Sequence, residues 1–353
     1  MTMTMADFAV FFSTQFTLLV SFFAIKIYVK QTDVLSGRYF HNDGDQLAHW
    51  DEHRVSPERN KTRPRPQAQA PTSLPARQGH RNTAQETPRQ APNQTEAGKV
   101  QTVGTQILVA PAALAPGVRI YAIGDIHGRA DLLRAMLAEI NTDRTRRPVN
   151  RPITLFIGDY VDRGPSSREV LDILLEYRDM SESIFLKGNH ETFISRFLKE
   201  PAVLNEWRLC GGLETLLSYG LKPSFNPDER ERRKLSEEFA GAVASDHLAF
   251  LNSLQLSFRC GDFLFVHAGI RPGVPLADQA EEDLLWIRED FLGSKAPFEV
   301  FVVHGHTPVR APEMWPNRLN IDTGAFATGR LTCAIIEGSA VMALTVDSAD
   351  TRS

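Results

Sequence analysis

Four short glycine-bounded motifs constrain this chain more than any other feature of its sequence. They are GDIHG at 124–128, GDYVDRG at 158–164, GNHE at 188–191 and HGHT at 304–307. Each places Asp, Asn or His in a turn just after a short apolar run, and His267 likewise follows the run at 263–266. Carboxylate, amide and imidazole groups are ligands for divalent ions such as Mn, Fe or Zn. The motifs therefore predict a metal site.

The spacing of apolar residues predicts an α/β fold. We expect strands at the short apolar runs 118–123, 153–157, 183–186, 263–266, 300–303, 331–336 and 341–346. Apolar residues at helical spacing follow the first three runs, at 131–140, at 167–177 and after Asn189. This alternation of strand and helix predicts a parallel sheet. The last two runs flank Glu337-Gly338-Ser339 and predict a hairpin.

The expected strand ends carry the polar side chains. A ligand-type residue follows each of five strands, namely Asp125, Asp159, Asn189, His267 and His306. Ligands of open α/β sheets bind beyond the carboxyl ends of the strands, so we expect these five residues to converge. Arg163 lies in the second motif, and its planar fork suits phosphate oxygens. The combination points to metal-assisted hydrolysis of a phosphate ester.

Composition excludes some classes of protein. The chain has 353 residues, and 42% of them are hydrophobic, which allows a sizeable core. A formal net charge of −4 argues against general binding of nucleic acids, which favours basic domains. The three cysteines, Cys210, Cys260 and Cys333, are odd in number and lack CxxC spacing. We therefore expect reduced thiols and no disulfide framework.

The first 30 residues predict a membrane anchor. The apolar run at 8–29 is about as long as the ~20 residues that a spanning helix needs, and no basic residue precedes it. Lys26, Lys30 and Arg38 come late in the run or after it, so the C-terminal side should face the cytoplasm. We expect a single pass through the inner or plasma membrane. A cleaved signal and a misassigned start codon are alternatives, and without an anchor the protein would be cytoplasmic.

The rest of the chain divides into three parts. Residues 31–115 are rich in Pro, Gln and Arg and poor in large apolar residues, which predicts a disordered linker. The catalytic domain is expected at 116–348, followed by a short tail at 349–353. Within that domain, residues 222–250 are expected to form a helical excursion over the site.

The motif set GDxHG, GDxxDRG, GNHE, HAG and GHT resembles the phosphoprotein phosphatase branch of the calcineurin-like metallophosphoesterases. The resemblance covers about residues 118–346 and is greatest to the bacterial and bacteriophage lambda type of serine/threonine phosphatase. It implies an α/β/β/α sandwich, in which two packed β-sheets are flanked by helices. It also implies hydrolysis of phosphomonoesters, with phosphoserine and phosphothreonine proteins as substrates.

The resemblance further implies a dinuclear metal centre. It would hold two divalent ions, with Mn expected and Fe or Zn as alternatives. Asp125 and His127 would hold the first ion, Asp159 would bridge both, and Asn189, His267 and His306 would complete the second. Such a centre activates water for direct attack on phosphorus, so no protein nucleophile is needed.

Four further residues would have catalytic roles. By the same resemblance, His190 would protonate the leaving alkoxide, and Asp162 would orient that imidazole. Arg163 and Arg288 would bind phosphate oxygens. Three neighbouring residues have weaker expectations. His304 would pack near the site or support it, Asp322 would support a ligand histidine, and Cys210 would alter the pocket wall.

Two other functions remain open. One is a symmetrical bis(5'-nucleosyl)-tetraphosphatase or a promiscuous hydrolase of small phosphoesters, which would keep the metal chemistry. Symmetrical tetraphosphatases typically have Ala where Asp162 stands and GNHD in place of GNHE, so the motifs favour the protein phosphatase. The other is a non-enzymatic scaffold that binds phosphoproteins, which the complete set of ligand-type residues disfavours. The oligomeric state is not predicted.

Overall fold

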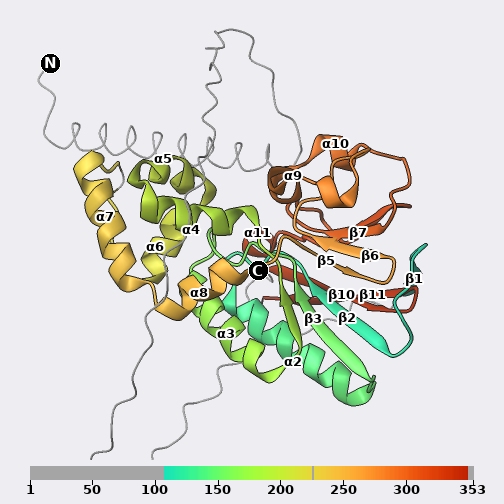
Figure 1. Cartoon of the computed structure of the whole chain (residues 1–353). Coiled ribbons are helices and arrows are strands. Elements are labelled where there is room, and N and C mark those ends of the chain that lie inside the picture. The colour runs from blue at the N-terminus through green and yellow to red at the C-terminus, as the bar shows by residue number, and fades with distance from the viewer. Residues whose placement is uncertain (1–106, 225, 349–353) are drawn as a thin grey trace, which may run out of the picture. The chain divides into compact units, whose positions relative to one another are not determined.

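Two β-sheets form the centre of the part of the chain that the computed structural model describes, residues 107–224 and 226–348 (Figure 1). The first sheet has, in spatial order, β1 (Ile107–Val109), β11 (Ala340–Asp347), β10 (Arg330–Glu337), β2 (Val118–Ile123), β3 (Arg151–Phe156) and β4 (Ser183–Phe185). The second has β5 (Ser257–Cys260), β6 (Phe263–Val266), β7 (Phe301–His304), β9 (Arg318–Asn320) and β8 (Glu313–Met314). Strands β2, β3 and β4 are mutually parallel, as are β6, β7 and β9.

Successive side chains of a strand point to opposite faces of its sheet. Both faces are covered here, which explains why these strands are almost wholly apolar. In β2, Ile120 and Ala122 join the core between the two sheets, whereas Tyr121 and Ile123 join the core beneath the helices. In β6, Phe263 and Phe265 point into the inter-sheet core, and the alternate residues point away from it. A strand that is covered on both faces needs apolar residues on both, and β2 and β6 have them, with Arg119 in β2 as the exception.

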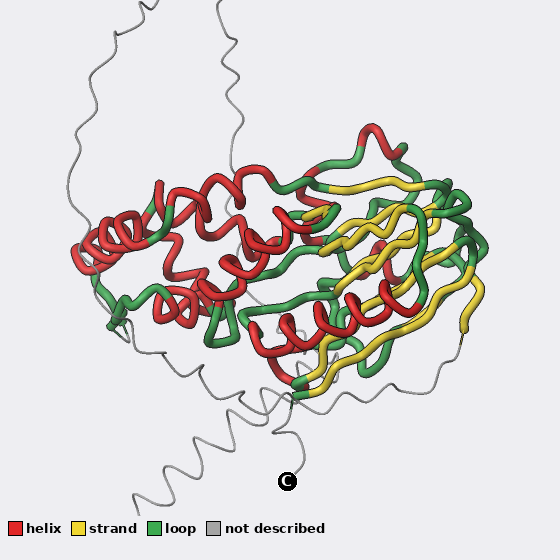
Figure 2. Tube along the Cα trace, turned by 90° about the horizontal axis from the view of Figure 1, so that it is seen from below, coloured by secondary structure: helices red, strands yellow, loops and turns green. Residues whose placement is uncertain are grey.

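Helices cover the outer faces of both sheets and form a lobe at one end of them (Figures 1 and 2). The α-helices are α2 (Ala130–Arg146), α3 (Ser167–Met180), α4 (Asn189–Lys199), α5 (Leu204–Trp207), α6 (Gly212–Ser218), α7 (Glu229–Ala242), α8 (Ser245–Ser253), α9 (Glu281–Trp286), α10 (Glu289–Leu292) and α11 (Ala325–Thr328). Short 3-10 turns are η1 (Pro201–Val203), η2 (Arg208–Cys210) and η3 (Leu276–Asp278). Helices α2 and α3 pack on the first sheet, and α9 and α10 pack on the second. The expected α/β/β/α sandwich is confirmed.

The segment 222–250 contains helices, as expected, but we predicted that they would lie over the site, and they do not. Helix α7 packs on α4 and η1, and Phe239 contacts the rings of Phe197, Trp207 and Tyr219. Ser236 on the same helix donates a hydrogen bond to the carbonyl of Phe197. The apolar face of α7 is therefore buried against the helical lobe. It buttresses the helices beside the site and does not cover the site.

The ordered domain also begins earlier than residue 116. Strand β1 pairs with β11 through the register Ile107 to Met342, and Leu114 is buried at the inter-sheet core. The expected linker therefore ends before Ile107, because backbone pairing holds a segment whose side chains are largely exposed. The expected anchor at 1–30, most of the linker and the tail lie outside the described residues. Within 107–224 and 226–348, no helix is long and apolar enough to cross a membrane.

We expect Phe265→Ala to destabilise the domain by roughly 3–5 kcal/mol, because the ring is fully buried between the sheets and its removal leaves a cavity. Urea denaturation followed by circular dichroism measures the change. Leu217→Ala on α6 is the matched control, since that side chain is 55% exposed and its truncation should shift stability by less than about 0.5 kcal/mol. Equal losses for the two variants would contradict the inter-sheet core.

Candidate metal centre

The loops that follow the parallel strands are tied to one another at one edge of the two sheets. The backbone N–H of His127 donates to the carbonyl of Asp159 at 2.8 Å, which joins the loops after β2 and β3. The N–H of Gly305 donates to the carbonyl of His267 at 2.8 Å, which joins the loops after β6 and β7. The N–H of His306 donates to Oδ2 of Asp125 at 3.1 Å and connects the two sheets. Four segments distant in sequence thus meet in one place.

Backbone strain is concentrated at this place. Among the described residues, the non-glycine positions with positive φ are His127, Asp159, Asp162, Arg163 and His306, with φ between 46° and 71°. Every one is a residue for which sequence analysis predicted a role. L-residues rarely adopt this conformation, and it persists where surrounding structure enforces it, as in functional sites.

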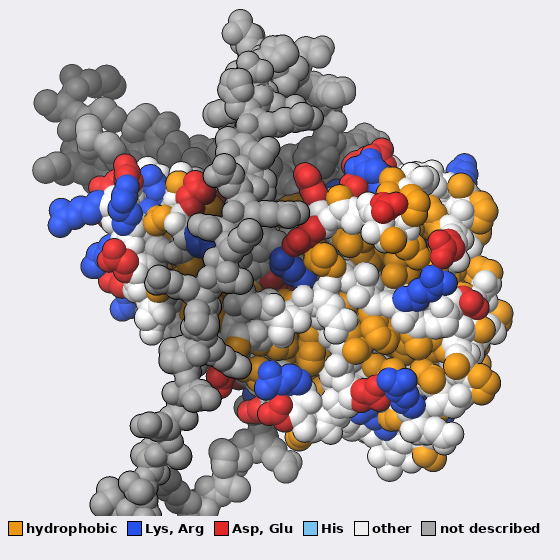
Figure 3. Space-filling model, viewed as in Figure 1, with side chains coloured by type: hydrophobic (Ala, Val, Ile, Leu, Met, Phe, Trp, Pro, Cys, Tyr) orange, Lys and Arg blue, Asp and Glu red, His pale blue; other side chains and the backbone are white. Residues whose placement is uncertain are grey.

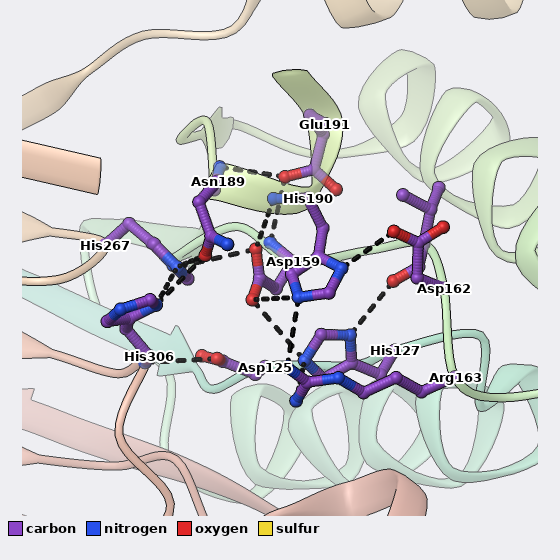
Figure 4. A network of polar contacts seen from close by, with 12 residues as sticks. Asp125, His127, Asp159, Asp162, Arg163, Asn189, His190, Glu191, His267 and His306 are labelled. Carbon is purple, nitrogen blue, oxygen red and sulfur yellow. Dashed lines mark hydrogen bonds and ion pairs between the residues drawn. The ribbon is translucent and has the colours of Figure 1, made fainter. Parts of the chain in front are cut away.

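Asp159 lies at the centre of the cluster, and its two carboxylate oxygens face different groups of side chains (Figure 4). Oδ2 lies 3.4 Å from Nε2 of His127, and Oδ1 lies 3.4 Å from Nε2 of His267. On the second side, Oδ1 of Asn189 lies 3.0 Å from Nε2 of His267 and 2.9 Å from Nδ1 of His306. Two adjoining groups of ligand atoms therefore share one carboxylate.

Backbone carbonyls set the tautomers of two histidines. Nδ1 of His127 donates to the carbonyl of Val161 at 2.9 Å, and Nδ1 of His267 donates to that of Ile157 at 3.0 Å. Each Nε2 is left with a lone pair directed at Asp159, the arrangement that orients metal-ligating imidazoles. Burial lowers the pKa of His127 and of His267, so both rings are neutral near pH 7, as ligands must be.

The residues present fit divalent cations. Asp125 and Asp159 are buried together with Asp322, and burial and the other two charges raise the pKa of Asp125 well above its usual value. Oδ1 of Asp125 and Nε2 of His306 are buried and, among the described residues, lack a hydrogen-bond partner. Buried carboxylates and unpaired acceptors are costly unless a cation compensates them. The donor set of carboxylate, amide and imidazole is one that divalent first-row metals accept.

His190 forms a buried pair with Asp162. Nδ1 of His190 donates to Oδ2 of Asp162 at 2.7 Å, and the carboxylate also accepts from Trp207 at 2.8 Å and from Thr215 at 2.6 Å. Burial alone would lower the pKa of His190, but the charges of Asp159 and Asp162 outweigh it and raise that pKa. Nε2 of His190 lies 3.8 Å from Oδ2 of Asp159. The pair therefore fixes a proton on Nδ1 and turns Nε2 of the imidazole toward the metal cluster.

Arg163 spans the first half of the cluster. Its Nη1 lies 3.0 Å from Nε2 of His127, and its Nη2 lies 3.1 Å from Nε2 of His190. The guanidinium is stacked on the ring of Phe326, with 4.8 Å from Cζ to the centroid. Arg288 lies on the other side, where its Nη1 donates to Oγ1 of Thr307 at 3.4 Å. Both arginines thus border the cluster of ligand-type residues.

Glu191 braces the centre, a role that sequence analysis did not assign. Its Oε2 accepts the N–H groups of Gly188 at 2.8 Å and of Asp159 at 3.0 Å, and its Oε1 accepts that of Tyr160 at 2.8 Å. It therefore joins the β3 loop to the start of α4. Its position three residues after the helix cap is a capping-box spacing, which was a usable signal. Trp207, Thr215 and Phe326 were also missed, and no motif marks them.

Three weaker expectations have different outcomes. Asp322 was expected to support a ligand histidine, but its carboxyl lies beside that of Asp125 and accepts the N–H of Gly324 at 2.8 Å. His304 is fully buried and packs edge-on against Phe291 at 4.9 Å, so it packs beside the site. Cys210 lies in the wall next to Arg163, whose N–H donates to the carbonyl of Gly211 at 3.0 Å.

The fold and the shared-carboxylate cluster define a metal-dependent phosphoesterase. Residues 118–329 match the family model described as calcineurin-like phosphoesterase, so the chain belongs to that family. This confirms the fold and the family that the motif set indicated.

Curated relatives are named for a nucleotide substrate. The asymmetrical bis(5'-nucleosyl)-tetraphosphatase PrpE of Anoxybacillus flavithermus is 28% identical over 229 residues, which is 60% of this chain and 87% of the relative. PrpE of Bacillus subtilis is 28% identical over 228 residues, with the same coverage of both chains.

Among solved structures, the metallophosphoesterase from Sphaerobacter thermophilus is 19% identical with a TM-score of 0.38, covering 66% of this chain and 89% of that one. A serine/threonine phosphatase from Saccharomyces cerevisiae with similarity to human PP5 is 16% identical with a TM-score of 0.41, covering 66% and 81%.

We expect Gly305→Ala to weaken metal binding at least tenfold. A Cβ at this position would lie 2.1 Å from Oδ1 of Asp125, so that carboxylate would have to move from the cluster. Isothermal titration with Mn²⁺ measures the affinity, and thermal unfolding checks that the variant folds. Gly241→Ala on α7 is the control, because nothing lies within 4 Å of the added Cβ. A folded Gly305→Ala protein with unchanged affinity would contradict the placement of Asp125 as a ligand.

Proposed function

We propose that this protein hydrolyses phosphoserine and phosphothreonine in other proteins. The observation that carries the proposal is the buried pair of His190 and Asp162, with 2.7 Å between Nδ1 and Oδ2. Asp162 holds one proton on Nδ1, and in the protonated ring Nε2, which faces the cluster, would carry the proton that passes to the leaving oxygen. This is the arrangement of an imidazole that donates a proton from a fixed atom during the reaction.

The leaving group explains why such a pair matters. The alkoxide of serine or threonine is a strong base and leaves poorly unless it is protonated. A nucleotide or nitrophenolate leaving group is a weak base and needs little protonation. The carboxylate of Asp162, 2.7 Å from Nδ1 of His190, favours the protonated imidazole, which suits the more difficult leaving group.

The other site residues have separate tasks in this proposal. Asp125, His127, Asp159, Asn189, His267 and His306 would hold two divalent ions, with Mn expected. Those ions would supply Lewis acidity and a water of lowered pKa. Arg163 would bind phosphate oxygens through its fork, held in place by Phe326, and Arg288 would contact the same group from the opposite side.

Hydrolysis of dinucleoside polyphosphates is a second candidate, because the curated relatives above are named for it. They are named as asymmetrical enzymes, whereas the motifs led us to consider the symmetrical kind. The same metal cluster would serve either reaction. The two candidates differ in whether the proton from His190 is required.

We also propose that residues 1–30 anchor the enzyme in a membrane, so that substrates are proteins near its cytoplasmic face. The apolar run at 8–29 supports this, and it lies outside the described residues. Carbonate extraction of the full-length protein tests it, since release into the supernatant would exclude an integral anchor.

We expect His190→Asn to lower turnover of a phosphothreonine peptide about 10²–10⁴-fold, the usual contribution of a general acid. Turnover of p-nitrophenyl phosphate should fall much less, because its leaving group needs little protonation. Asp162→Asn should show the same pattern more weakly. Steady-state kinetics with Mn²⁺ on both substrates provides the measurement. Equal losses on the two substrates would count against proton donation by His190.

The substrate class is tested by a direct comparison. We expect the purified protein with Mn²⁺ to have a kcat/KM at least tenfold higher for a phosphothreonine peptide than for diadenosine tetraphosphate. Asp159→Asn, which weakens the shared ligand, is the control for metal-dependent turnover of both. A preference for the dinucleotide would replace the first candidate by the second.

A further inference from the structure

A cavity of about 400 Å³ adjoins the metal cluster, and none of the proposed metal ligands lines it. It is formed where α9 leads into α10, and it is lined by Arg271, Ala280, Glu282, Asp283, Trp286, Ile287, Arg288, Glu289 and Asp290. Trp286 connects it to the centre, because the indole meets the ring of His306 edge-on at 6.2 Å. Arg288 connects it a second time through Thr307, the residue after His306. A phosphoester bound at the metals would therefore have this cavity beside it.

The lining of the cavity is acidic. Two guanidinium groups and four carboxylates line it, for a net charge of −2. Arg271 is paired with Asp283 at 2.7 Å and with Asp290 at 2.9 Å. Glu282 and Glu289 are exposed, and neither forms an ion pair with any residue that the structure describes. In Figure 3, acidic side chains gather on the surface around α9. The carboxylates of Glu282 and Glu289 are therefore available to pair with a bound ligand.

An aromatic face accompanies these charges. The side chain of Trp286 is 37% exposed, although the ring also contacts Phe193 edge-on at 6.1 Å. The exposed part of the indole offers an aromatic surface to a planar cation, and guanidinium groups stack on such rings. The same carboxylates would repel the additional phosphates of a dinucleoside polyphosphate. Both features favour a cationic ligand.

We propose that this cavity is a specificity subsite that binds an arginine or lysine side chain next to the phosphorylated residue of a substrate protein. The arginine would stack on Trp286 and pair with Glu282 or Glu289. This proposal rests on the proposed function, and it adds that preferred substrates are basic around the phosphorylated residue.

The test uses full-length protein with Mn²⁺ and three phosphothreonine peptides that differ only in the residues flanking the phosphothreonine, which are Arg, Ala or Glu. We expect kcat/KM to fall in that order, with Arg about tenfold above Ala, mainly through KM. The preference should shrink as salt is added, because exposed charges are screened.

Variants identify the cavity as the source of the preference. Glu282→Gln combined with Glu289→Gln should reduce the ratio between the Arg and Ala peptides to about twofold or less. The same double variant should hydrolyse diadenosine tetraphosphate faster than the wild type, a gain that structural damage would not produce. Trp286→Leu should also lower the ratio. Glu237→Gln, an exposed carboxylate on α7 away from the cavity, is the matched control and should keep the ratio.

The outcomes distinguish a failure of the proposed subsite from a failure of the proposed phosphatase function. A ratio that is equally high in the double variant and in the wild type would overturn the subsite and leave the phosphatase function standing. Hydrolysis of diadenosine tetraphosphate without hydrolysis of any phosphopeptide would overturn the proposed function, and the basic-substrate subsite with it.

Discussion

The carboxylate of Asp159 is the contact on which the rest of the centre depends. One oxygen faces His127 and the other faces His267, so the spacing of both ligand groups is set by one buried side chain. Its backbone is held at φ 51° by the loops around it, and its N–H is fixed by Glu191. A buried anion in this position would be unfavourable alone. It is tolerated because histidines and an arginine surround it and because cations can bind there.

The two-sheet architecture explains how so many ligand atoms reach one carboxylate. Strands β2, β3 and β4 end at the same edge of the first sheet, and β6 and β7 end at the facing edge of the second. Phenylalanines of the inter-sheet core keep those edges in contact. The hydrogen bond from the N–H of His306 to Asp125 then closes the gap, and it requires the absence of a side chain at Gly305. Packing between the sheets is therefore as necessary to the centre as the ligands themselves.

Much of this arrangement follows from sequence patterns, and the exceptions have physical causes. The parallel strands and the ligand-type residues after them were predictable, because apolar runs and glycine-bounded turns are local signals. Trp207, Thr215 and Phe326 were not predictable, since their roles depend on how helices and a distant loop pack around Asp162 and Arg163. Strand β1 was missed because it lies in a segment poor in large apolar residues and is held by its pairing with β11.

The difference between local motifs and surfaces formed by packing also applies to the choice of substrate. The motif residues form a centre that can act on many phosphate esters, and they lie within residues 118–329, which match the family model. The surfaces that would meet the rest of a substrate come from segments outside the motifs, namely the turn around Cys210 and the junction of α9 with α10. At 28% identity, a relative can share the centre and differ at those surfaces. The charges and the partly exposed indole of the α9–α10 junction are therefore the features on which the proposed substrate preference depends.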